Sequence, residues 1–172
     1  SSSSEGAAPV DVSFVVIGFN EAESLGPCLR SVRDADMSGL SYEVIYVDAG
    51  SQDSSVSVAR EAGADRILGG EKRRRAAENR NLGWREARGR FVQFLDGDMA
   101  LAPDWPKAAI QLLEERDDTA AVCGNLNEAN TGIIFKALAI DWAPREGYIR
   151  HCGGAAMYRR EVLKEMDGFP ED

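Results

Sequence analysis

Two carboxylates separated by one glycine, Asp96 and Asp98, directly follow the apolar run at residues 91–95. Most side chains of this run are large or β-branched, which predicts a buried strand. Gly97 has no side chain to hinder a sharp turn between the two aspartates. Two hard oxygen ligands this close suit Mg²⁺ or Mn²⁺, and such a cation could bridge the two phosphates of a nucleotide diphosphate. Asp-Gly is also a common turn dipeptide, so an ordinary turn is the alternative.

Two other apolar runs end on polar residues that would extend this site. Residues 12–17 and 42–47 are rich in β-branched side chains, which predicts buried strands, and they are followed by the segment 18–21 and by Asp48. In an open α/β sheet, ligands bind outside the carboxyl ends of the strands. Parallel strands share that edge, so we expect the three strand ends to converge in one cleft.

Strands and helices alternate over the first 125 residues, which predicts an α/β fold. This order favours a mostly parallel central sheet with helices on both faces. The predicted strands lie at 12–17, 42–47, 66–68, 91–95 and 120–124, and the helices begin at Ala22, after Asp53 or Ser54, at about Arg74 and after Pro103.

The alternation stops after Asn125. Residues 132–141 are apolar and are predicted to form a helix, whereas 155–158 are predicted as a short strand and 160–166 as a helix. A loop-rich segment of this kind on an α/β scaffold often shapes a second substrate site.

Length and charge narrow the class of protein. The 172 residues suffice for one domain, which we place at 12–172 after a flexible leader at 1–11. The formal net charge of -9 leaves no broad basic field, so nucleic acid is not expected as a partner. No apolar run reaches the length of about 18 residues that a membrane span needs. The three cysteines contain no Cys-x-x-Cys pair, so they do not indicate a disulfide framework and favour a reducing compartment.

The basic run at 72–75 is a local exception to the acidic charge. Such a run is most often a solvated face, although it could also assist phosphate binding from a mobile loop. Arg80, on the helix that follows, lies on a stripe of small residues. A guanidinium that faces inward there needs an anionic partner.

A series of ordered motifs resembles the family 2 glycosyltransferases, which have the nucleotide-sugar-binding GT-A fold. The resemblance covers nearly all of residues 12–172. It rests on Val15-Val-Ile-Gly-Phe-Asn-Glu21, Glu43-Val-Ile-Tyr-Val-Asp-Ala-Gly-Ser-Gln-Asp53, Ala76-Ala-Glu-Asn-Arg-Asn-Leu-Gly83, Phe94-Leu-Asp-Gly-Asp98, Gly153-Gly154 before Tyr158-Arg-Arg160, and Asp167-Gly-Phe169. It implies a GT-A-type, Rossmann-like, mostly parallel central sheet, and a catalytic domain whose C-terminal part lies beyond residue 172.

The resemblance also implies which residues bind the nucleotide-sugar. Asp48 would accept a hydrogen bond from the base, most naturally uracil N3–H; Phe19 would stack on or flank the base; Arg80 would contact the base edge or a phosphate. The alternatives are a turn-forming aspartate, a core phenylalanine and a surface salt bridge. The full predicted set is Gly18, Phe19, Glu21, Asp48, Gly50, Arg80, Asp96 and Gly97.

A divalent cation, Mn²⁺ or Mg²⁺, is implied at the two aspartates. Asp98 would bind it directly, and Asp96 would hydrogen-bond the ribose or a metal-bound water. The cation would neutralise charge on the leaving diphosphate. The implied reaction is an inverting transfer of a hexosyl group from a nucleotide-diphospho-sugar, with a UDP-sugar favoured, to the hydroxyl of a carbohydrate or lipid-linked acceptor.

A general base must take the proton of the acceptor hydroxyl. In the family it belongs to an acidic pair shortly after the G-G-F element. Here Glu171 and Asp172 either form that pair, with Asp172 as the catalytic base, or the base lies in a segment downstream. His151, Gly153 and Gly154 are predicted on the acceptor side, although His151 is equally well explained as an ordinary loop histidine.

Four residues depart from the family pattern, and they weaken any statement about which nucleotide base is bound. Gly18 and Phe19 replace the usual proline and tyrosine, Ala49 replaces an aspartate, and Met99 replaces the last aspartate of D-x-D-D. None removes the essential cation ligand.

Two other classes of function compete with the enzyme. One is a nucleotide-sugar-binding module that is catalytically silent because the base-bearing segment is absent. The other is a nucleotidyltransferase, which we rank last because the residues after the first strand are acidic rather than basic. For the enzyme we expect a cytoplasmic location at the inner face of a membrane, with peripheral or distal attachment.

Overall fold

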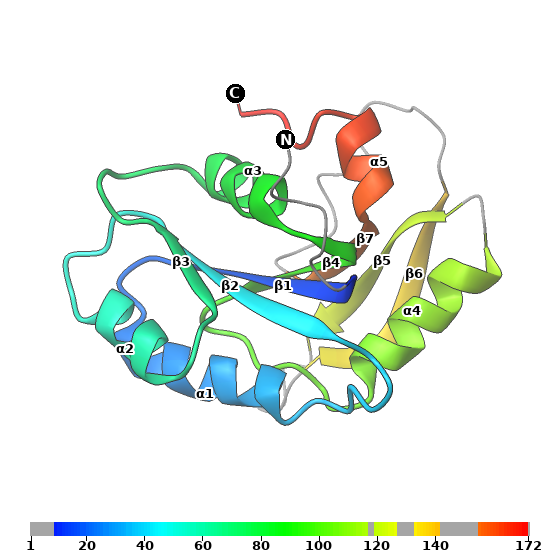
Figure 1. The fold of residues 1–172 in the computed structure, drawn as a ribbon, viewed down its shortest axis with the longest axis horizontal. Coiled ribbons are helices and arrows are strands. Elements are labelled where there is room, and N and C mark those ends of the chain that lie inside the picture. The colour runs from blue at the N-terminus through cyan, green and yellow to red at the C-terminus, as the bar shows by residue number, and fades with distance from the viewer. Residues whose placement is uncertain (1–8, 117–118, 127–132, 142–154, 172) are drawn as a thin grey trace.

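A seven-stranded sheet forms the centre of the protein, and helices cover both of its faces (Figure 1). The computed structural model describes residues 9–116, 119–126, 133–141 and 155–171. The strands are β1 (Val10–Gly18), β2 (Tyr42–Asp48), β3 (Arg66–Gly69), β4 (Gly89–Asp96), β5 (Thr119–Leu126), β6 (Ile133–Asp141) and β7 (Ala156–Arg159). The helices are α1 (Ala22–Arg33), α2 (Ser55–Glu61), α3 (Ala76–Glu86), α4 (Trp105–Glu115) and α5 (Arg160–Glu165).

The sheet has a parallel half and an antiparallel half. Its strand order is β3-β2-β1-β4-β7-β5-β6. β1 pairs in parallel with β2 and β4, and β2 does so with β3, because each connection between them contains a helix that carries the chain back. β7 runs antiparallel to both β4 and β5, and β5 runs antiparallel to β6.

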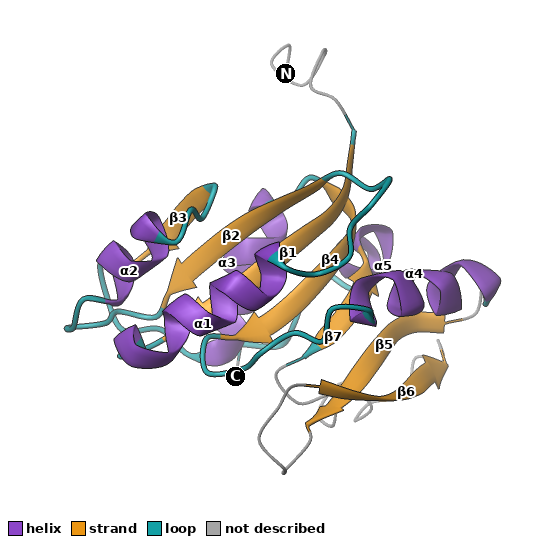
Figure 2. Cartoon of the chain, turned by 90° about the horizontal axis from the view of Figure 1, so that it is seen from below, coloured by secondary structure: helices purple, strands orange, loops and turns teal. Residues whose placement is uncertain are grey.

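Each face of the sheet has its own hydrophobic core, because alternate side chains of a strand point to opposite faces. In β1, Phe14 and Val16 pack with apolar side chains of α1, α2 and α4. Val15 and Ile17 pack on the other face with side chains of α3 and α5. The view in Figure 2 shows α1, α2 and α4 on the near side of the sheet and α3 behind it.

The predicted α/β class is confirmed, and most predicted elements are present within a few residues of their expected bounds. The helix predicted at 132–141 is wrong, because Ile133–Asp141 forms strand β6 beside β5. A short apolar run cannot be distinguished as a buried strand or a helix from periodicity alone. The cysteine prediction also fails in part, since Cys28 is free but Cys123 is disulfide-bonded. None of the described helices has the length and apolar character needed to cross a membrane.

Helix α3 lies close to the sheet because Gly83 has no side chain. A Cβ atom at this position would stand 2.3 Å from Cγ1 of Val15 and 3.1 Å from Cγ2 of Val47. We therefore expect Gly83→Ala to lower the free energy of unfolding by about 1–3 kcal/mol, the usual cost of overpacking a core.

Urea unfolding of the two proteins measures this difference. Gly26→Ala in α1 is the matched control, because its Cβ would meet no atom closer than 3.5 Å. The control should be neutral or stabilising, since alanine favours helix more than glycine does. Equal stabilities of Gly83→Ala and Gly26→Ala would contradict the close contact between α3 and β1.

Candidate active site

Strand register aligns the ends of β1, β2 and β4. Gly18 of β1 pairs with Asp48 of β2, and Ile17 pairs with Asp96 of β4. The backbone N–H of Gly97 donates to the carbonyl of Ile17 at 2.8 Å, which continues this pairing past the end of β4. The predicted convergence of these strand ends at one edge is therefore present.

Three carboxylates lie together at this edge. The Oε2 atom of Glu21 is buried and has no hydrogen-bond partner. A Cβ atom on Gly97 would stand 2.5 Å from this oxygen, and one on Gly18 would stand 3.3 Å from it. Gly97 lies in the turn after β4, as the sequence predicted, and the N–H of Met99 donates to the Asp96 carbonyl across this turn at 2.9 Å. The two glycines also leave the space that the Glu21 carboxyl occupies between Asp96 and the end of β1.

The surroundings of Glu21 raise the pKa of its carboxyl group. Burial raises it most, and the charges of Asp98 and Asp96 raise it further, to about 7. Burial also raises the pKa of Asp96, whereas the Arg80 guanidinium, 3.8 Å away, lowers it. Cys28, beneath the same strand end, donates its S–H to the Asp96 carbonyl at 3.5 Å, and burial raises the pKa of its thiol to about 12.

The donor set at this edge fits a hard divalent cation. Asp98 is exposed, whereas Asp96 is half-buried and paired with Arg80. Mg²⁺ is commonly held by one or two carboxylates together with substrate phosphates. Within the described ranges, no three His, Cys, Asp or Glu side chains form a group that could hold a metal ion by itself. Any cation here would therefore depend on Asp98, Asp96 and ligands from the substrate, and it would offset the negative charge that surrounds the unpartnered Glu21 oxygen.

Asp48 is fully buried and organises the turn after β2. Its Oδ1 accepts hydrogen bonds from the hydroxyls of Tyr46 and Ser51, both at 2.7 Å, and its Oδ2 accepts from the N–H groups of Gly50 at 3.1 Å and Ser51 at 2.7 Å. These four contacts correspond to the turn-forming alternative and use the usual capacity of a carboxylate. A hydrogen bond to a base would have to replace one of them. The φ of +94° at Gly50 explains the glycine in this turn.

The basic run at 72–75 packs onto the strand ends. The Arg73 guanidinium lies over the Phe19 ring, 3.5 Å from its centroid, and its Nη1 donates to the Ala49 carbonyl at 3.4 Å. The N–H of Arg74 donates to the same carbonyl at 3.2 Å. Phe19 is half-buried and is not a core residue. A base that stacks on this face of Phe19 must displace Arg73, because the two planes are already in contact.

Asn81 is a structural residue that the sequence did not single out, although it lies in the motif beside Arg80. Its buried amide accepts from the N–H of Phe169 at 2.8 Å and from the indole N–H of Trp84 at 3.0 Å, and it donates to the Phe169 carbonyl at 2.9 Å. It therefore fixes the segment 167–169 to α3. The signal that could have found it is a polar residue on the inward stripe of α3.

Glu171 belongs to the same anchored segment. It accepts a hydrogen bond from the Asn81 amide at 2.8 Å and lies 4.0 Å from the Arg85 guanidinium. Its described contacts are thus with α3. The other residues predicted on the acceptor side or as the base, namely His151, Gly153, Gly154 and Asp172, lie outside the described residues.

The raised pKa of Glu21 makes stability depend on pH. Between pH 4.5 and about 7 the folded protein retains a proton on Glu21 that an unfolded glutamate releases. The free energy of unfolding should therefore fall as pH rises through this window. Glu21→Gln cannot titrate, so we expect the variant to lack this part of the fall.

The measurement is urea unfolding of both proteins across the window, in buffer with a chelator so that no cation binds. Glu23→Gln is the matched control, because Glu23 is an exposed glutamate of the same helix. The free energy of unfolding of this control should change with pH as that of the wild type does. The same change with pH in Glu21→Gln would show that Glu21 is not the group responsible.

Comparison with known proteins gives relatives that are sugar transferases by name. A dolichyl-phosphate beta-glucosyltransferase of Drosophila melanogaster is 34% identical over 152 residues, which are 77% of this chain and 46% of that protein. A dodecaprenyl-phosphate galacturonate synthase of Rhizobium johnstonii is 32% identical over 172 residues, which are 91% of this chain and 50% of that protein. The chain therefore spans about half the length of these relatives.

Solved structures show the same fold. The mannosyltransferase PcManGT from Pyrobaculum calidifontis, in complex with GDP-Man and Mn²⁺, has a TM-score of 0.72 and 23% identity over 97% of this chain and 51% of that chain. S. aureus TarS 1-349 in complex with UDP also has a TM-score of 0.72, with 21% identity over 94% of this chain and 51% of that chain. The fold is thus of the GT-A type.

A family model described as glycosyl transferase family 2 matches residues 13–167. This match covers most of the chain and includes the ends of β1, β2 and β4. It also includes the carboxylates Glu21, Asp96 and Asp98, which we call the acidic edge. The protein belongs to glycosyl transferase family 2.

Proposed function

We propose that this protein transfers a hexosyl group, with inversion, from a nucleotide-diphospho-sugar to an acceptor hydroxyl. The observation that carries the proposal is the cluster of Glu21, Asp96 and Asp98 at the carboxyl edge of the parallel strands. Membership of glycosyl transferase family 2 supports it. The names of the relatives, which include lipid-phosphate sugar transferases, favour a lipid-linked acceptor over a free carbohydrate.

The aspartates have distinct parts in this proposal. Exposed Asp98 would hold Mg²⁺ or Mn²⁺ directly, and the bound cation would supply Lewis-acid neutralisation of the departing diphosphate. Arg80 orients Asp96 through their ion pair, so that one carboxylate oxygen remains available for a ribose hydroxyl or a metal-bound water. Glu21, once ionised, would add negative potential beside the cation, and a bound cation would favour the loss of its proton.

A UDP-sugar is the donor that we favour. Phe19 would present its ring to the base after Arg73 moves away, and Asp48 would exchange a turn hydrogen bond for one from uracil N3–H. Gly18 allows the Tyr46 hydroxyl to approach the end of β1, and Gly50 allows the backbone of Lys72 to approach the turn after β2. Arg73, once displaced, would remain close enough to meet the diphosphate.

The acceptor side involves the segments downstream of β6. We propose that His151, Gly153 and Gly154 line it. The general base is either the Glu171 and Asp172 pair or a carboxylate beyond residue 172. We favour the second, because Glu171 is engaged by Asn81 and Arg85. Action at the cytoplasmic face of a membrane would suit a lipid-linked acceptor.

A catalytically silent nucleotide-sugar-binding module is the second candidate. The contacts of Glu171 favour it, because this carboxylate is already engaged by Asn81 and Arg85. Incubation with UDP-glucose and a polyprenyl phosphate separates the two functions. Formation of a glycolipid supports the enzyme, and binding without turnover supports the silent module.

Metal-dependent nucleotide binding is the first outcome that the proposal predicts. We expect UDP to bind in the presence of Mn²⁺ and to bind at least about tenfold more weakly to Asp98→Ala, because a charged metal ligand is lost. Calorimetric titration, with and without Mn²⁺, measures both affinities.

The matched control is Asp34→Ala, which removes an exposed carboxylate at the end of α1. It should bind UDP like the wild type. Binding of GDP or TDP but not UDP would refute the uracil preference alone. Failure of all three nucleotides would refute the donor site itself.

A further inference from the structure

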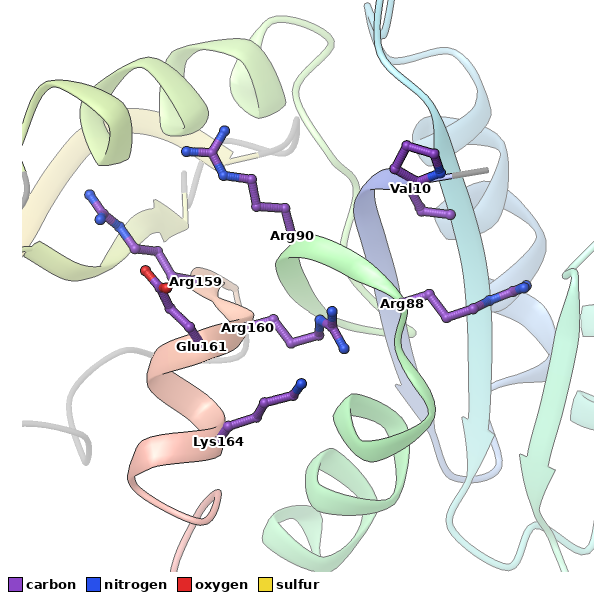
Figure 3. Close-up of a pocket in the computed structure, with 8 residues that line it drawn as sticks. Val10, Arg88, Arg90, Arg159, Arg160, Glu161 and Lys164 are labelled. Carbon is purple, nitrogen blue, oxygen red and sulfur yellow. The ribbon is translucent and has the colours of Figure 1, made fainter. Parts of the chain in front are cut away.

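A pocket lies at the end of the parallel strands opposite the candidate active site. It has a volume of about 510 Å³ and is bounded by Val10 at the start of β1 and by Arg90 near the start of β4 (Figure 3). Asp96 and Asp98 follow the other end of β4, so the two sites are separated by the length of the strand. None of the residues around this pocket belongs to the acidic edge.

The charge of the pocket lining is opposite in sign to the net charge of the protein. Five basic side chains and a single acidic one line it, although the formal net charge of the whole chain is -9. The basic residues come from two stretches far apart in the sequence, the approach to β4 and the β7–α5 junction. They are Arg88, Arg90, Arg159, Arg160 and Lys164.

Two of these cations are already neutralised. The Arg88 guanidinium forms a salt bridge of 3.3 Å with Glu43, and the Arg90 guanidinium forms one of 3.3 Å with Glu114. In Figure 3 the Arg88 guanidinium turns away from α5, and the Arg90 guanidinium points towards α4. The aliphatic parts of these two side chains form part of the pocket wall, while their charges are paired with glutamates.

Arg159 is only partly satisfied. Its Nη2 donates to the carbonyls of Leu113 and Arg116, at the C-terminal end of α4. Its Nε is buried and has no hydrogen-bond partner. Because this nitrogen is enclosed, Arg159 does not offer it to a ligand in the pocket, and its guanidinium is held by the end of α4.

Arg160 and Lys164 carry the remaining positive charge. They lie four residues apart on α5, where like charges repel and destabilise a helix. Among the residues that the structure describes, neither forms a salt bridge with a carboxylate, and Arg160 reaches only the Ala87 carbonyl, at 3.5 Å. Their side chains turn towards the same space between α5 and the start of β4 (Figure 3).

We propose that this pocket binds a phosphate group, carried either by a soluble phosphorylated compound or by a lipid headgroup. A phosphate monoester has close to two negative charges, which match the two unpaired cations. The guanidinium of Arg160 can bind phosphate oxygens in a forked geometry, and Lys164 adds a mobile ammonium. The site is independent of the donor site at Asp98, and it needs no metal.

Calorimetric titration with inorganic pyrophosphate in a chelator tests the proposal, because the chelator prevents any contribution from a metal-dependent site. We expect saturable binding to the wild-type chain, and a loss of about tenfold or more in Arg160→Gln/Lys164→Gln. Circular dichroism establishes that the double variant is folded. Arg160→Gln alone should show an intermediate affinity if folding of the double variant fails.

The matched control is Arg30→Gln/Arg60→Gln, which removes the same charge from exposed positions on α1 and α2. It should retain the wild-type affinity. Equal losses in the two double variants would show a general charge effect and overturn the proposal. So would the absence of pyrophosphate binding at about millimolar concentration, provided that the vesicles described next also fail to bind.

Vesicles distinguish the two sources of phosphate. Sedimentation with phosphatidylglycerol–phosphatidylcholine vesicles, compared with phosphatidylcholine alone, measures binding to a lipid headgroup. Vesicle binding that is lost in Arg160→Gln/Lys164→Gln assigns the pocket to a lipid, whereas pyrophosphate binding without vesicle binding assigns it to a soluble compound.

Discussion

The parallel pairing of β1 with β2 and β4 is the interaction on which the candidate active site depends. Gly18 is level with Asp48 on one side, and Ile17 is level with Asp96 on the other. A shift of one residue along either neighbour would move the aspartate to the other face of the sheet. The two hydrophobic cores hold this register, because each side of β1 is buried beneath helices.

This register places like charges together, at a cost to stability. Glu21, Asp96 and Asp98 lie around the space left by Gly18 and Gly97, where burial first, and then the charges of Asp98 and Asp96, raise the pKa of Glu21 to about 7. Arg80 offsets only part of the charge, through Asp96. Under the proposed function, a cation bound with the donor would offset this repulsion, which would explain why the like charges are kept together.

The two ends of the strands have opposite electrostatic character. Carboxylates gather where β1 and β4 end, and basic side chains gather near where these strands begin. Between the ends, buried polar side chains tie distant segments to the scaffold: Asn81 fixes the segment 167–169 to α3, and Glu43 binds Ser13 of β1 and Arg88 before β4. The sheet thus holds the acidic residues and the basic pocket at opposite ends of its parallel strands.

The sequence alone determined the alternation of strands and helices, the family and the acidic residues at the strand ends, because apolar periodicity and short ordered motifs are local properties. It did not determine the conformation of residues 133–141, since a short apolar run suits either a strand or a helix until a partner strand is present. It placed Gly97 in a turn, which is correct, but it did not show that the absence of a side chain there also admits the Glu21 carboxyl. The contact of Arg73 with Phe19, the enclosed position of Asp48 and the basic pocket were decided only by the tertiary structure. Each of these features forms between residues that are far apart in the chain. Neither periodicity nor motif spacing predicts such long-range contacts.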